Sequence, residues 1–92
     1  MDAVRKVKEG TLDWVYIDAN HKFDYAMEDI IAWSRRVRRG GICSGDDYYE
    51  LSAKWNDGGV PDAVRAYTQA NRIAVWYIFQ GHKSVDWMFV KP

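Results

Sequence analysis

Two short apolar runs that each end in aspartate place the strongest constraint on the fold of this chain. The run Leu12–Ile17 is rich in aromatic and β-branched residues and stops at Asp18; the run 42–45 stops at Asp46 and Asp47. Continuous apolar runs of this kind favour strands that are buried on both faces, as in parallel sheets. We therefore expect two strands with carboxylates directly after them.

Helical patterns separate these strands from each other and from the end of the chain. Apolar residues recur every 3.6 positions over residues 24–38, with Asp24 as the expected N-cap and Gly40 and Gly41 as the stop. A second helix is expected from Val60, with Pro61 in its first turn, and residues 2–8 allow one or two further turns. The last turn of the 24–38 helix carries four arginines, which suit a solvated helix end better than a phosphate or nucleic-acid site: Arg35, Arg36, Arg38 and Arg39.

The C-terminal part of the chain has the pattern of a β-hairpin. Two apolar runs, 73–79 and 84–90, are joined by a short connection that contains Gly81. With the earlier elements, the order is strand, helix, strand, helix, strand, strand. This order predicts an α/β fold: an open sheet of about four strands, mostly parallel with one antiparallel strand at the C-terminus, flanked by helices. Cys43 lies in the second strand and is expected to be an inert core thiol.

Composition and charge exclude several classes of protein. The 92 residues carry 13 basic and 13 acidic side chains, a balance that argues against a dedicated nucleic-acid binder. No apolar run reaches the roughly 20 residues of a membrane-spanning helix, and the first six residues do not lead into the apolar core expected of a secretory signal. A single cysteine excludes an internal disulfide framework. We expect a cytoplasmic protein with no nucleic-acid or membrane partner.

The strand ends are where chemistry is expected, because ligands of open α/β sheets bind at the carboxyl ends of the strands. Parallel pairing would bring Asp18 close to Asp46 and Asp47, and carboxylate oxygens suit Mg²⁺ or Ca²⁺. His21, near the same edge, could act as a general base or a metal ligand. The alternative is that these residues are turn and capping groups. Acceptor contacts are expected from aromatic residues in the following loop: Tyr48, Tyr49 and Trp55.

The two strand ends together resemble a known family. The segment Ile17-Asp18-Ala19-Asn20-His21, a helix, and then Gly40-Gly41-Ile42-Cys43-Ser44-Gly45-Asp46-Asp47-Tyr48 is similar to the second half of a class I S-adenosylmethionine-dependent methyltransferase. The resemblance is closest to the branch with an Ile-Asp-x-x-His strand end, which is related to the catechol-type O-methyltransferases. The resemblance extends from about Leu12 to Pro92 and implies a partial Rossmann-like sheet. The strand order that it implies is the Leu12 strand, the Ile42 strand, the Ser84 strand and the Ile73 strand.

The resemblance also implies roles for these residues. In the catechol-type enzymes, acidic residues at the two strand ends hold a divalent metal, and Asp18, Asp46 and Asp47 fall on those positions. A basic residue three places beyond the first aspartate removes the acceptor's proton, and His21 falls there. The catechol enzymes have Lys at that position and usually Asn at the position of Asp47, so a metal-free branch is an alternative to a Mg²⁺ enzyme.

The glycine-rich turn that binds the cofactor in this family has no counterpart in the chain, whose glycines form no G-x-G-x-x-G pattern. The resemblance therefore implies one partial domain over residues 1–92, equivalent to the C-terminal half, without the N-terminal cofactor-binding half. The leading function is S-adenosylmethionine-dependent O-methyl transfer to a small-molecule or sugar hydroxyl. The alternative is a non-catalytic domain that forms a homodimer or complements a separate N-terminal half, because the Leu12–Ile17 strand would have an open edge.

Overall fold

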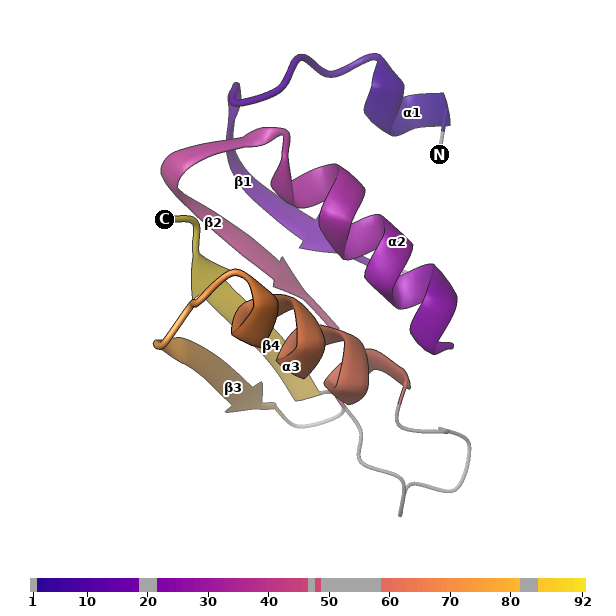
Figure 1. Cartoon of the computed structure of the whole chain (residues 1–92), viewed down its shortest axis with the longest axis vertical. Coiled ribbons are helices and arrows are strands. Elements are labelled where there is room, and N and C mark those ends of the chain that lie inside the picture. Colours follow the sequence, from indigo (N-terminus) through magenta and orange to yellow (C-terminus); the bar gives the residue numbers. More distant parts are fainter. Residues whose placement is uncertain (1, 19–21, 47, 49–58, 82–84) are drawn as a thin grey trace.

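The computed structural model describes residues 2–18, 22–46, 48, 59–81 and 85–92. Three helices and four strands follow one another along the chain, and Figure 1 shows their arrangement. In chain order they are α1 (Asp2–Arg5), β1 (Leu12–Ile17), α2 (Phe23–Ser34), β2 (Val37–Gly45), α3 (Gly59–Ala70), β3 (Trp76–Gln80) and β4 (Val85–Val90). This order and the α/β class agree with the sequence prediction.

The four strands form one mixed sheet in the order β1-β2-β4-β3. β1 and β2 are parallel, with Ile17 opposite Gly45, whereas β4 is antiparallel to both β2 and β3. The predicted strand order, the parallel first pair and the C-terminal hairpin are therefore confirmed. β4 is the reversed strand, and it lies inside the sheet between β2 and β3.

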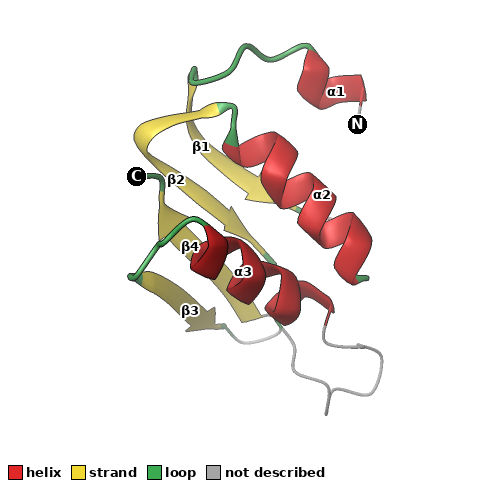
Figure 2. Cartoon of the chain, in the orientation of Figure 1, coloured by secondary structure: helices red, strands yellow, loops and turns green. Residues whose placement is uncertain are grey.

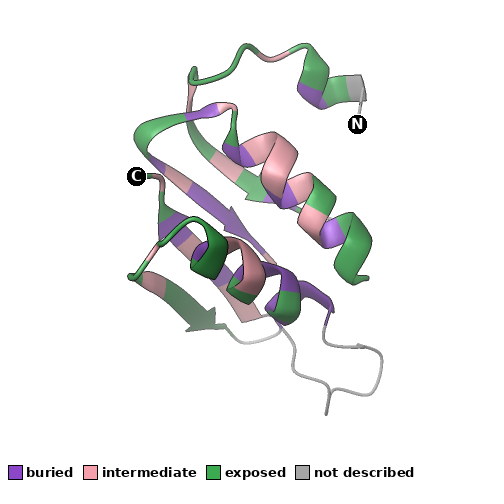
Figure 3. Ribbon diagram, viewed as in Figure 1, coloured by how far each residue is buried: buried purple, intermediate pink, exposed green. Residues whose placement is uncertain are grey.

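Both longer helices cover the same face of the sheet (Figures 1 and 2). Trp87 and Phe89 of β4 project to this face, where their rings stack 6.0 Å apart, and Phe89 also stacks on Tyr67 of α3. From α2, Ile30 is buried against the same layer. Figure 3 shows this buried layer along β2, β4 and the inner sides of the helices, whereas β3 is largely exposed.

The first long helix is shorter than its apolar period predicts. α2 begins after Lys22, not at an Asp24 cap, and ends at Ser34; the predicted end at Arg38 is wrong. The next residues turn and enter β2, because the backbone N–H groups of Thr11 and Leu12 bond to the Arg36 carbonyl and draw this segment into the sheet. The predicted arginine-rich last turn is therefore divided between a turn and the start of β2.

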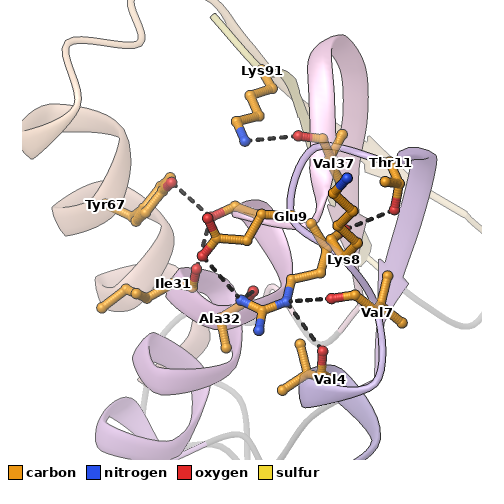
Figure 4. Close-up of polar contacts among 12 residues, drawn as sticks. Val4, Val7, Lys8, Glu9, Thr11, Ile31, Ala32, Val37, Tyr67 and Lys91 are labelled. Carbon is orange, nitrogen blue, oxygen red and sulfur yellow. Dashed lines mark hydrogen bonds and ion pairs between the residues drawn. The ribbon is translucent and has the colours of Figure 1, made fainter.

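The Arg36 side chain fixes the N-terminal segment against α2. Its Nε donates to the carbonyls of Val4 and Val7, both at 3.1 Å, and its Nη1 donates to the Ala32 carbonyl at 3.3 Å. Glu9 lies 3.7 Å from the same guanidinium group. Figure 4 shows these carbonyl and carboxylate oxygens converging from three segments of the chain. A half-buried guanidinium with several acceptors is a structural anchor, so Arg36 holds α1 in place.

β1 is an edge strand. The sequence predicts that it is buried on both faces, and this prediction is wrong, because one face is exposed. Val15 and Ile17 point toward the helices, whereas Trp14 and Tyr16 lie on the opposite face and are exposed. The described residues include no element that covers that face. Cys43 on β2 is fully buried, and burial raises the pKa of its thiol to about 11, which supports the predicted inert core thiol.

Candidate functional site

The carboxyl ends of β1 and β2 bring two of the predicted carboxylates together. Ile17 and Gly45 are directly paired across the two strands, so Asp18 and Asp46, the next residue of each strand, leave the sheet side by side. The Asp46 N–H also donates to the Ile17 carbonyl at 3.4 Å. The juxtaposition of Asp18 and Asp46 that parallel pairing predicts is therefore present.

A small cavity lies below this edge, between the sheet and the first turns of α2 and α3. Its lining is apolar apart from Asp46 and comprises Ile17, Ala26, Ile30, Asp46, Val60 and Trp87. Its volume of about 10 Å³ is at the lower limit for one water molecule. The described residues therefore place a carboxylate over a closed core here, and they do not enclose a substrate-sized pocket at this point.

A third carboxylate joins the site from β4, and the sequence analysis did not single it out. The Tyr16 hydroxyl donates a hydrogen bond of 3.1 Å to Asp86 Oδ1. Partial burial, this bond and the negative charges of Asp46, Asp86 and Asp18 raise the pKa of Tyr16 to about 12. Because β4 is antiparallel to β2, residues near the start of β4 lie at the carboxyl end of β2. This topology is the feature from which Asp86 could have been identified as a site residue.

The raised pKa of Tyr16 predicts a pH effect on stability. Because the folded-state value lies above the ordinary value of 10, the neutral phenol contributes stability that is complete below about pH 10 and is lost as the pH rises toward 12. A spectroscopic titration measures the ionisation of the tyrosines to tyrosinate. The Tyr16→Phe variant should therefore lack a tyrosinate signal that appears in the native chain only near pH 12. Asp86→Asn should lower the pKa of Tyr16, and an unchanged titration in that variant would contradict the described cluster.

The other predicted site residues have different outcomes. Tyr48 is buried, with its ring 5.8 Å from that of Trp76 and the Arg65 guanidinium 5.8 Å over the ring, so it lies in the core near the site. Its acceptor contact stays a prediction. The other predicted residues lie outside the described residues: His21, Asp47, Tyr49 and Trp55.

Among the described residues, no group of three or more His, Cys, Asp and Glu side chains is placed to hold a metal ion. Two carboxylates nevertheless suit Mg²⁺, which proteins commonly bind through one or two carboxylates with water completing the shell. Asp18 and Asp46 fit that limited role. None of the described helices is long and apolar enough to cross a membrane.

Comparisons with known proteins agree with this fold. A "putative O-methyltransferase" from Klebsiella pneumoniae has a similar structure, with a TM-score of 0.58 and 16% identity over 99% of this chain and 46% of that chain. An O-methyltransferase from Bacillus cereus, solved in complex with SAH, gives a TM-score of 0.57 and 18% identity over 98% of this chain and 45% of that chain. At these identities the likeness shows the fold, and the chain spans less than half the length of either protein.

Sequence comparison identifies the family. The search of curated proteins finds no match. The family model described as "Methyltransferase domain" matches residues 1–48, which is more than half of the chain and includes both carboxylate-bearing strand ends. The chain therefore belongs to the methyltransferase domain family.

Proposed function

We propose that this chain supplies the acceptor side of an S-adenosylmethionine-dependent O-methyltransferase that acts on a hydroxyl of a small molecule or sugar. The observation that carries the proposal is the pairing of Ile17 with Gly45, which puts Asp18 and Asp46 side by side at the carboxyl edge of the sheet. Family membership supports methyl transfer, and a structural neighbour in complex with SAH supports the type of cofactor.

The proposed roles follow the chemistry of these side chains. Asp18 and Asp46, with Asp47, would hold Mg²⁺ and orient the acceptor hydroxyl, and the cation would favour its deprotonated form. His21 would take the hydroxyl proton as general base. S-adenosylmethionine supplies the methyl group when bound. The cavity of about 10 Å³ at the described strand ends does not accommodate this cofactor, so no step in the proposal assigns cofactor contacts to these residues.

Magnesium binding is the first test of the proposal. Millimolar Mg²⁺ should raise the melting temperature above that in chelator, because a ligand that binds only the folded state stabilises it. Asp46→Asn should reduce this shift. Asp13→Asn is the matched control, because Asp13 lies at the opposite end of β1, where it forms a 2.8 Å ion pair with Arg38. The bound cation should also lower the pKa of Tyr16 by offsetting the nearby carboxylates.

Identical melting curves in chelator and in Mg²⁺ would contradict the metal role and leave the metal-free branch. Calorimetric titration with S-adenosylmethionine, with and without Mg²⁺, tests the cofactor separately. Heat of binding supports a methyltransferase. No heat under either condition supports the second candidate, a non-catalytic domain that associates with itself or with a separate N-terminal half; the exposed aromatic side chains of β1 favour this candidate.

A further inference from the structure

The sheet face opposite the helices carries several exposed apolar side chains and is not covered by any of the described residues. We call it the open face. Strand register assigns its members: Trp14 lies opposite Ile42, which lies opposite Val90, and Tyr77 lies opposite Met88. Six apolar side chains on this face or at its rim each expose between 43% and 62% of their surface: Trp14, Tyr16, Val75, Tyr77, Phe79 and Val90.

The apolar area of the open face can be compared with the area that a protein interface buries. If an aromatic side chain presents about 200 Å², the four half-exposed rings alone offer roughly 400 Å². Contiguous patches on monomeric proteins rarely exceed a few hundred Å², and a standard interface buries about 800 Å² on each partner. The aromatic rings supply about half of that area, and the aliphatic side chains between them add to it. The face therefore offers a substantial part of the area that one partner of a standard interface buries.

The side chains of the open face are held in a fixed arrangement. Trp14 Nε1 donates to Ser44 Oγ at 2.9 Å, and the Tyr16 hydroxyl donates to Asp86. The rings of Tyr77 and Phe79 stack 6.3 Å apart on β3. Ordered aromatic side chains lose little conformational freedom on association, which favours binding.

Charges at the two ends of the open face are opposite in sign. Asp18 and Asp86 lie at the carboxyl end of β1, where their charges act on Tyr16. Arg72 precedes β3, which runs parallel to β1, so it lies at the other end; there it lines an apolar groove with Tyr77 and Val90. A two-fold axis between two such faces, perpendicular to the strands, would reverse one sheet and set Arg72 of each copy over the acidic end of the other.

We infer that the open face binds a second copy of this chain, forming a two-sheet sandwich with the helices on the outside. Sheets that pack face to face lie about 10 Å apart with their side chains interdigitated, and the aromatic rows of the two copies can fill that layer. The apolar rows of the two copies would thus contact each other, and the opposite charges at the two ends of each face would lie over one another. This inference concerns assembly and does not depend on the proposed methyl transfer.

Sedimentation of the 92-residue chain over a micromolar concentration range tests the inference. We expect a dimer of about 21 kDa, twice the mass of the 10.7 kDa chain. Tyr77→Lys should raise the dimer's dissociation constant about 30-fold or more, because it places a charge among the stacked rings of the apolar layer. Tyr25→Lys is the matched control: Tyr25 is 55% exposed on α2, against 49% for Tyr77, and its substitution should leave the dimer unchanged.

A charge exchange tests the orientation of the two copies. Arg72→Asp and Asp86→Arg should each weaken the dimer several-fold, and the double variant should recover most of the loss. A chain that stays monomeric at micromolar concentration with a cooperative melt overturns the inference. So does a dimer that resists Tyr77→Lys but is dissociated by Val15→Lys, because that result assigns the contact to the β1 edge.

Discussion

Replacing Trp87 by alanine is expected to lower the free energy of unfolding by about 3–5 kcal/mol. Trp87 is 2% exposed at the centre of the helix-covered face, where it stacks on Phe89 and closes the small cavity below Asp46. Removing the indole enlarges a space that the neighbouring backbone cannot fill. A chain of this length has roughly 5–14 kcal/mol of total stability, so the variant should be marginally folded.

Urea denaturation followed by far-ultraviolet circular dichroism measures this effect, with Trp14→Ala as the control of the same residue type. Trp14 is 58% exposed and makes one hydrogen bond to Ser44, so its loss should cost about 1 kcal/mol. Equal losses from the two variants would contradict the assignment of Trp87 to the core and of Trp14 to the open face.

The hairpin was predictable from the sequence because its pattern is local in the chain, whereas the strand order was predicted from the family resemblance. The end of α2 was not predictable in the same way. Arg36 continues the helical period, but its carbonyl accepts two backbone hydrogen bonds from the segment before β1, and its side chain binds α1. Such contacts join residues 24 to 32 positions apart, and no periodicity within a window of the sequence carries that information.

The two faces of β1 illustrate the same limit. A run of apolar residues indicates that both faces can be buried, but it does not say whether another element is present to cover each face. Parallel pairing of β1 and β2 determines one part of the site, the placement of Asp18 beside Asp46, and the sequence predicted that part. Asp86 was missed although the predicted strand order put the last strand beside β2, because its contact with Tyr16 depends on the register of that strand, which the order does not give.

Gly45→Ala is expected to destabilise the chain by about 1–3 kcal/mol and to disturb the candidate site directly. A methyl group at Gly45 would lie 2.7 Å from the Ile17 carbonyl oxygen and 2.7 Å from the Trp87 ring. The backbone angles of Gly45 do not require glycine, so the expected cost comes from this close approach alone. Relief of the contact would push the ends of β1 and β2 apart, which separates Asp18 from Asp46.

A double-mutant cycle with Trp87→Phe identifies the source of the effect. The smaller ring removes one of the two close contacts, so Gly45→Ala should cost less in the Trp87→Phe background than in the native chain. The contact with the Ile17 carbonyl persists, so recovery should be partial, and any stabilisation by Mg²⁺ should stay weakened in the double variant. Additive losses of stability would show that the indole does not limit the space at Gly45. The proximity of β1 and β2 at this glycine is thus the structural basis for bringing the two carboxylates together.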